Sequence, residues 1–221
     1  RQAGSVTSRT VPLVRVPRML PKILSPVEVD ALVGALRSWR DRAMVEAMLL
    51  GGLRRNETLG LRLEDLKPGE RRVFVAEGKG GHSRLIPISD RFLSTVAAYL
   101  DGERPRAVST DRLFLVLKGP NRGRPLTPKG LEQIIRSGKE RAGLSHLTCH
   151  ELRHTCPTRL REAGMSLEAV QAQAGHRSIE STRIYLHLAN GWLADEYRRA
   201  SDRIDTDAFA RQITDLGDAH P

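Results

Sequence analysis

The stretch TCHELRHTCPTRLREAG, residues 148–164, is where the fold of this chain can first be predicted. Thr148 followed three residues later by Glu151 matches a capping box, the pattern that satisfies backbone N–H groups where a helix begins. We therefore expect a helix that starts at Thr148. On such a helix His150 and Arg153 are three residues apart and share one face.

The segments on either side of this helix also carry start and stop signals. Ser25 to Glu28 forms a second capping box with proline at the first helical position, and Pro128 follows Thr127 in the same way. Apolar periodicity and glycine stops predict further helices at 26–38, 41–50, 90–101, 127–142, 166–174, 178–189 and 191–213. Two short strands, 71–77 and 83–89, flank a glycine-rich turn at 78–81. The predicted fold class is mainly α with a small antiparallel β-sheet, that is, α+β.

The charge of the chain indicates a polyanionic partner. The net charge is +10, and residues 191–221 hold four arginines against seven acidic residues, so the positive charge belongs to the first 190 residues. Such a basic body is typical of proteins that bind nucleic acid. Aromatic residues are only 4% of the chain, which argues against a single-strand stacking platform and favours contact with a duplex backbone.

The two cysteines and the apolar runs exclude some other classes. Cys149 and Cys156 would lie about 10 Å apart on one helix, too far for a disulfide, so we expect free thiols in a reducing cytoplasm. No run of 18 apolar residues occurs, and we expect no membrane partner.

The motif HELRH, 150–154, allows two opposite interpretations. It matches H-E-x-x-H, in which His150 and His154 would bind zinc and Glu151 would act as a base. A zinc metallopeptidase is therefore one alternative, but it would place the permanent cation of Arg153 beside a divalent metal, and no third ligand stands out. The other interpretation begins with Arg153, because a guanidinium is a preferred planar donor for phosphate oxygens.

Further residues with chemistry suited to a phosphodiester are distributed along the chain. Each of them alone is more commonly a surface, turn or core residue, and Arg55 competes with its neighbour Arg54. Together they would supply what phosphodiester cleavage without a metal requires. The candidate catalytic set is Arg54, Lys79, His150, Arg153, His176 and Tyr185.

With these residues in place, the sequence resembles the tyrosine recombinases, the phage-integrase family of site-specific DNA recombinases. The resemblance covers roughly residues 25–190 and rests on four stretches in the order and spacing of the family. They are GLRRNETLGLRLEDL (52–66), GKGGHSRLIPI (78–88), HELRHTCPTRLREAG (150–164) and AGHRSIESTRIYLHL (174–188).

The resemblance implies which residues bind the scissile phosphate and which one supports them. Arg54 and Arg153 would hold the non-bridging oxygens of the scissile phosphate and stabilise the transition state. His176 would hydrogen-bond the same phosphate. Glu57 would be structural and would hold the arginine segment in place.

The resemblance also implies the course of the reaction. Tyr185 would attack phosphorus to form a 3′-phosphotyrosyl link, with His150 accepting its proton. Lys79 would protonate the departing 5′ oxygen. The covalent link conserves the energy of the broken bond, so neither ATP, a metal nor another cofactor is expected.

The expected domain organisation follows from the same resemblance. Residues 1–22 are basic and proline-rich, and would be the linker from a missing N-terminal DNA-binding domain. Residues 23–190 would be the catalytic domain. Residues 191–221 would form a C-terminal helix and tail that packs either on its own domain or on a neighbouring protomer.

The expected partner is double-stranded DNA, with Arg122, Arg124 and Lys129 as phosphate contacts. The resemblance implies a homotetramer on DNA, joined through the C-terminal segment, and a monomer without DNA. The expected location is the cytoplasm, in association with the nucleoid. The resemblance also implies a link to a mobile genetic element.

One departure from the family leaves a further alternative. Pro157 falls about two turns into the helix that HELRH opens, removes the hydrogen bond to the Arg153 carbonyl and predicts a kink or break. That would disturb Arg153, so a DNA-binding relative with impaired catalysis also stays open.

Overall fold

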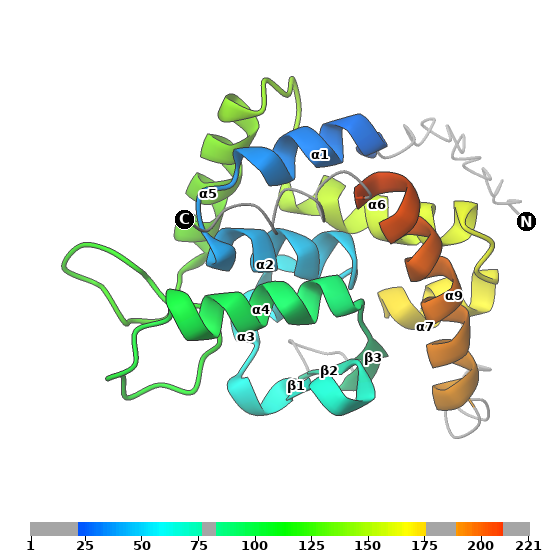
Figure 1. Ribbon diagram of the computed structural model, residues 1–221, viewed down its shortest axis with the longest axis horizontal. Coiled ribbons are helices and arrows are strands. Elements are labelled where there is room, and N and C mark those ends of the chain that lie inside the picture. The colour runs from blue at the N-terminus through cyan, green and yellow to red at the C-terminus, as the bar shows by residue number, and fades with distance from the viewer. Residues whose placement is uncertain (1–21, 77–82, 176–188, 210–221) are drawn as a thin grey trace, which may run out of the picture.

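The computed structural model describes residues 22–76, 83–175 and 189–209 (Figure 1). The described part is mainly helical with one small antiparallel sheet, which confirms the predicted fold class. The elements in chain order are α1 Pro26–Ala35, α2 Trp39–Leu49, α3 Arg55–Gly60, the 3-10 helix η1 Leu63–Asp65, β1 Leu66–Lys67, the 3-10 helix η2 Pro68–Glu70, β2 Arg72–Val75, β3 Arg84–Pro87, α4 Asp90–Gly102, α5 Pro128–Arg141, α6 Cys149–Glu162, α7 Leu167–Ala174 and α9 Ala189–Phe209.

Helix starts follow the predicted caps with one difference. At α1, Ser25 and Glu28 form the complete capping box. At α6, the Thr148 hydroxyl accepts from the Glu151 N–H at 3.1 Å. The Glu151 carboxylate, which a complete capping box would place on the Thr148 N–H, lies instead beside His146, 3.3 Å from Nδ1. The sequence therefore located this helix correctly while only half of its capping box forms.

The sheet has three strands in the order β1-β2-β3, one more than predicted. Strand β1 has only two residues, too few to show an alternating pattern in the sequence. Between β2 and β3, Val73 pairs with Ile86 and Val75 with Arg84, so these four side chains share one face. Val73, Val75 and Ile86 are buried, which makes this the core-facing side of the sheet.

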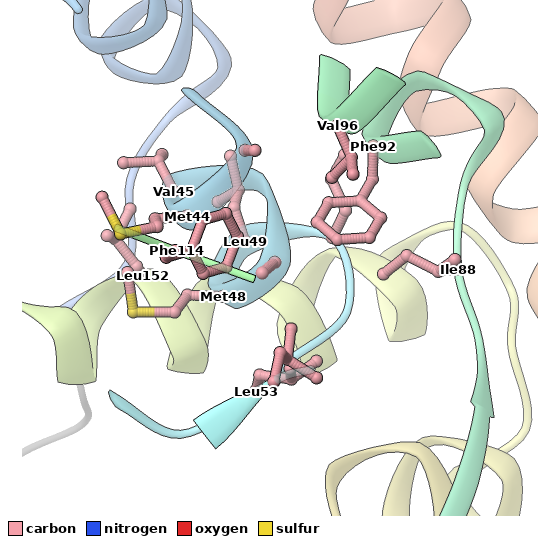
Figure 2. Close-up of a cluster of buried hydrophobic side chains, with 14 of the residues drawn as sticks. Met44, Val45, Met48, Leu49, Leu53, Ile88, Phe92, Val96, Phe114 and Leu152 are labelled. Carbon is pink, nitrogen blue, oxygen red and sulfur yellow. The ribbon is translucent and has the colours of Figure 1, made fainter. Parts of the chain in front are cut away.

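Helix α2 lies at the centre of the fold, between α4 and α6 (Figure 1). Nine of its eleven residues are buried, so it is enclosed on nearly every side, and the buried residues include the charged Arg40, Asp41 and Glu46. Its side chains meet those of α4, α6 and the segment before α5, as Figure 2 shows for Met44, Met48, Phe92 and Phe114. This packing fixes the C-terminal end of α2, from which the candidate site is built.

A second, smaller core joins α6, α7 and α9. It contains Cys156, Leu160, Met165, Ala169, Val170, Tyr197 and Ala200. Helix α9 thus packs on its own domain, against α1, α6, α7 and β3. Cys149 and Cys156 are both free thiols, as predicted.

Of the kink or break predicted at Pro157, the break is wrong, because α6 continues through it from Cys149 to Glu162. A proline in a helix removes one backbone hydrogen bond, and burial of Cys156 and Leu160 on either side stabilises the continued helix. The doubt that this proline raised about Arg153 is therefore not supported.

Several predicted features lie outside the described residues. They are the helix at 178–189, the turn at 78–81 and all but the last residue of the linker 1–22. Within the ranges that are described, no helix has the length and apolar character needed to cross a membrane.

Candidate active site

Arg54 is presented by a tight turn at the end of α2. A Cβ at Gly51 would lie 2.8 Å from the backbone oxygen of Ala47, and Gly52 has φ +67°, so both positions favour glycine. Arg54 is then the N-cap residue of α3, and its side chain is 48% exposed. Its Nη1 donates to Glu57 Oε1 at 2.7 Å and its Nη2 donates to the Gly175 carbonyl at 3.2 Å.

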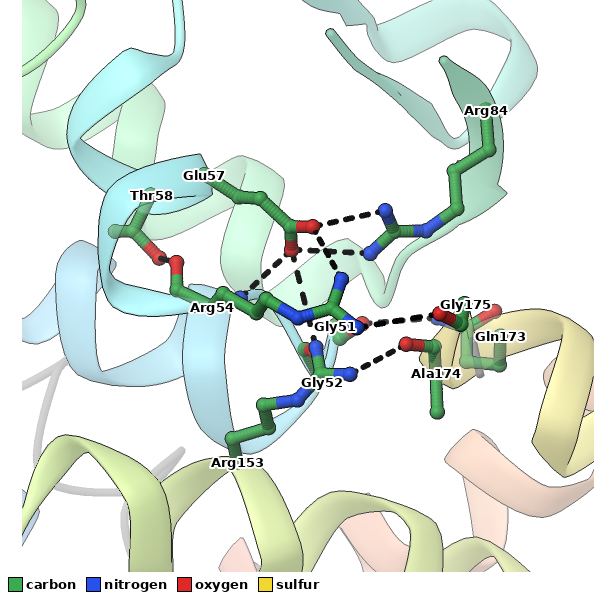
Figure 3. Close-up of polar contacts among 10 residues, drawn as sticks. All are labelled: Gly51, Gly52, Arg54, Glu57, Thr58, Arg84, Arg153, Gln173, Ala174 and Gly175. Atoms are coloured by element: carbon green, nitrogen blue, oxygen red, sulfur yellow. Dashed lines mark hydrogen bonds and ion pairs between the residues drawn. The ribbon is translucent and has the colours of Figure 1, made fainter. Parts of the chain in front are cut away.

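Arg153 reaches the same place from α6, with a side chain that is only 9% exposed. Its Nη1 donates to the Gly52 carbonyl and its Nη2 to the Ala174 carbonyl. Its Nη1 also lies 3.8 Å from Glu57 Oε2 (Figure 3). The two predicted arginines, 99 positions apart in sequence, are therefore brought together as expected for a phosphate clamp.

Glu57 is the carboxylate at the centre of this cluster. Burial would raise its pKa, but hydrogen bonds from Arg84 and from the Arg54 backbone, with the charge of Arg84, lower that pKa to about 2. Burial and the neighbouring charge of Arg54 lower the pKa of Arg153 to about 10, which still leaves it charged at neutral pH. The site is thus a cluster of fixed cations around one ionised carboxylate.

Arg84 is the member of this cluster that sequence reasoning missed. It donates from Nη1 and Nη2 to the two oxygens of Glu57, each at 3.0 Å (Figure 3). The signal that could have found it is the strand alternation. Arg84 falls two residues before Ile86, on the face of β3 that points to the core, and a charge at such a position requires a partner.

The turn that carries Arg54 is itself held by side chains from three helices. The Leu50 carbonyl accepts from Tyr197 Oη of α9 at 2.8 Å and from Cys156 Sγ of α6 at 3.3 Å. The Gly51 carbonyl accepts from Gln173 Nε2 of α7 at 3.2 Å. With Arg153 on the Gly52 carbonyl, each of the three carbonyls that follow α2 has at least one side-chain donor.

His150 and His154 form a pair in the first turns of α6. Their Nε2 atoms are 2.7 Å apart and their rings are edge-to-face. A hydrogen bond between two imidazole nitrogens needs one donor and one acceptor, so the pair shares a single proton there.

The zinc interpretation of HELRH gains nothing from this geometry. Among the described residues, no group of three or more His, Cys, Asp or Glu side chains could hold a metal ion. The carboxylate of Glu151, which would be the base of a peptidase, lies beside His146.

Three predicted catalytic residues, Lys79, His176 and Tyr185, lie outside the described residues. The chain next to two of them is described. Strand β3 begins five residues after Lys79, and α7 ends in Gly175, in the left-handed conformation with φ +62°, directly before His176. The candidate DNA contacts Arg122, Arg124 and Lys129 are exposed, on the loops between α4 and α5 and on the first turn of α5.

Comparison with known proteins places this arrangement in a family. The sequence profile of the Phage integrase family matches residues 22–191. The tyrosine recombinase XerC of Roseiflexus castenholzii is 37% identical over 185 residues, which are 79% of this chain and 57% of that protein. The chain thus spans little more than half the length of this relative.

Solved structures agree in fold. The crystal structure of XerA recombinase superposes with a TM-score of 0.67 at 29% identity, over 83% of this chain and 66% of that one. The XerH site-specific recombinase bound to palindromic difH substrate, a post-cleavage complex, has a TM-score of 0.61 at 26% identity, over 80% and 52% of the two chains. Together with the profile match, these likenesses show that the chain belongs to the phage integrase family of tyrosine recombinases.

Proposed function

We propose that this chain is the catalytic domain of a site-specific DNA recombinase, which cuts and rejoins DNA strands through a covalent 3′-phosphotyrosyl link. The observation that carries the proposal is the convergence of Arg54 and Arg153. Both arginines contact Glu57, and they donate to the consecutive carbonyls of Gly175 and Ala174, immediately before His176 in the sequence.

The charge of this cluster suits the reaction. Arg54, Arg84 and Arg153 carry three positive charges against the single negative charge of Glu57, so the cluster has a net charge of about +2 at neutral pH. A phosphodiester carries one negative charge, and a second develops on its oxygens when a nucleophile adds. Cations that are already fixed in place stabilise this developing charge without reorganisation.

The remaining groups would perform the bond changes. The phenol oxygen of Tyr185 attacks phosphorus while its proton passes to His150. The bond from phosphorus to the 5′ oxygen breaks, and Lys79 donates a proton to that oxygen. His176 hydrogen-bonds the phosphate. In the second step a 5′-hydroxyl displaces Tyr185, so the number of phosphodiester bonds is conserved and no ATP, metal or cofactor is consumed.

His154 would orient His150 for this step. If His150 donates from Nε2 to His154, its Nδ1 is left as the acceptor for a proton. The pair therefore offers a way to fix the tautomer of the base.

Double-stranded DNA is the substrate that the charge and the family support. XerH was solved with its difH substrate, and this chain has a net charge of +10. Arg122, Arg124 and Lys129 would contact phosphates, each adding about 0.9 to the slope of log affinity against log salt. We further propose a homotetramer on DNA joined through the C-terminal segment, a monomer without DNA, and action at the nucleoid.

Trapping the covalent intermediate tests this function. A nicked suicide duplex is incubated with the chain in excess chelator, and the protein is resolved on a denaturing gel. We expect an adduct that protease removes, and none from Tyr185→Phe, which should still shift the duplex in a native gel. An adduct of equal yield in Tyr185→Phe would refute the nucleophile, and a duplex bound but never linked by the unaltered chain would refute the activity.

A further inference from the structure

We propose that Arg84 is a positioning residue of this active site, which orients Glu57 and through it the two phosphate-binding arginines. This inference rests on the proposed function and adds a residue to it. Arg84 and Glu57 meet fork to fork, with Nη1 to Oε1 and Nη2 to Oε2 both at 3.0 Å. Both side chains are largely buried, at 16% and 8% exposure, so the pair is well shielded from water.

The bidentate contact fixes the plane of the Glu57 carboxylate. Each carboxylate oxygen then has a second partner on Arg54. Oε1 accepts from the Arg54 guanidinium and Oε2 from the Arg54 backbone N–H, both at 2.7 Å. Rotation of the carboxylate would misalign both contacts, so Arg84 controls the direction in which the Arg54 side chain points.

Arg84 also packs tightly against the end of α7. A Cβ on Gly175 would lie 2.9 Å from both Cζ and Nε of Arg84, so only glycine leaves room for the guanidinium. Gly175 in turn accepts a hydrogen bond from Arg54 and directly precedes His176. The planar face of Arg84 therefore sets the distance between the arginine cluster and the end of α7.

Arg84 connects three segments of the site that are distant in the sequence. Arg84 opens β3, five residues after Lys79, whereas Glu57 lies on α3 and Gly175 ends α7. One side chain thus links three segments that adjoin Lys79, Arg54 and His176 in the sequence. Both terminal nitrogens of Arg84 are bound to Glu57, so Arg84 would act on the reaction through that carboxylate.

Loss of Arg84 should change how cleavage depends on pH. The charged groups that face Glu57 in the described structure are Arg54, Arg84 and Arg153. Burial raises the pKa of Glu57, and Arg84 is the leading group that lowers it. In Arg84→Gln that pKa should rise, so Glu57 becomes protonated as the pH falls, and a protonated carboxyl no longer holds Arg54 from both oxygens. In the unaltered chain the pKa of Glu57 is about 2, so protonation of Glu57 should not slow cleavage at mildly acid pH.

Two measurements test the inference, one with DNA and one without. Single-turnover cleavage of the suicide duplex is followed from about pH 5.5 to pH 8.5. We expect Arg84→Gln to cleave about tenfold more slowly at the alkaline end and to lose further activity toward the acid end. In the absence of DNA, the carboxyl 13C shift of Glu57 should titrate at higher pH in Arg84→Gln than in the unaltered chain.

The matched control is Arg40→Gln. Arg40 is also a buried arginine in a short ion pair, with Asp41, but it lies at the opposite end of α2, about 15 Å along the helix. This variant should lose stability and keep the pH profile of cleavage. If Arg84→Gln does not fold, Arg84→Lys, which keeps the charge and lacks the fork, is titrated instead and should also raise the pKa of Glu57.

A double-mutant cycle with Glu57→Gln separates positioning from direct contact with DNA. If Arg84 acts through Glu57, adding Arg84→Gln to Glu57→Gln should slow cleavage no further. Multiplied losses, or an unchanged pH profile in Arg84→Gln, would overturn the inference. If the unaltered chain forms no adduct, the proposed function fails by itself, and the titration of Glu57 still decides whether Arg84 governs that carboxylate.

Discussion

Replacing Glu46 with glutamine should change how the free energy of unfolding depends on pH. Glu46 lies on α2 with no exposed surface, and its Oε1 accepts from Arg91 Nε of α4 at 3.0 Å. Burial raises its pKa from 4.5 to about 7, and the charge of Arg91 offsets only part of that rise. The folded state therefore holds this proton more tightly than the unfolded chain does.

The direction and size of the effect follow from this difference. Because the folded-state pKa is raised, stability is lost as the pH rises from about 4.5 through 7, where the folded carboxyl must ionise in the core. A shift from 4.5 to about 7 corresponds to about 3 kcal/mol at 1.36 kcal/mol for each pH unit. Glu46→Gln imitates the protonated side chain and lacks this loss.

Urea denaturation followed by circular dichroism measures both proteins between about pH 5 and pH 8. We subtract the free energy of unfolding of the unaltered chain from that of Glu46→Gln at each pH. This difference should increase by about 2 to 3 kcal/mol from about pH 5 to pH 8, whether it is positive or negative at pH 5. Other titrating groups cancel in the difference. A difference that stays constant within about 0.5 kcal/mol would show that Glu46 is ionised or solvated throughout, and the reasoning would be wrong.

Three further predictions concern the end of α2 and its neighbours. Tyr197→Phe removes the hydroxyl that donates to the Leu50 carbonyl and should cost about 1 kcal/mol in urea denaturation, with no change expected if the bond is absent in solution. Burial raises the pKa of the Cys156 thiol to about 12, so it should react with a disulfide reagent only as fast as the chain unfolds. Gly175→Ala should lower stability by about 1 to 3 kcal/mol and reduce adduct yield, because its Cβ would strike Arg84 and φ is +62°; an unchanged melting temperature would contradict this.

Local signals in the sequence were enough to predict most of the helices. Serine or threonine caps and the first-turn prolines located α1, α5 and α6 to within a few residues, because these bonds form between neighbours in the chain. The six-residue helix α3 and the two-residue strand β1 were missed, since neither is long enough to show a period. Pro157 does not end α6, because packing around the helix outweighs the loss of one backbone hydrogen bond.

The sequence was enough to predict which residue types form the site, but not which of these residues contact one another. The motifs identified Arg54 and Arg153, and their spacing suggested a common site. What no spacing reveals is that both would share Glu57 with an arginine from β3, because that contact depends on how α3, β3 and α6 pack together. Arg84 could have been recognised only by noticing a charge on the buried face of a strand.

The carbonyls of Leu50, Gly51 and Gly52, at the end of α2, join three helices that are distant in sequence into one cooperative unit. Helices α6, α7 and α9 each supply a donor to Leu50, Gly51 or Gly52. Withdrawing α6 or α7 leaves a buried acceptor unsatisfied, and withdrawing α9 leaves the Leu50 carbonyl with only the weak thiol donor of Cys156. We therefore expect amide hydrogens at the core of these helices to exchange at similar rates, in a single opening event. The segment that aims Arg54 would then be among the slowest parts of the protein to open, although it includes two glycines and leads to an exposed arginine.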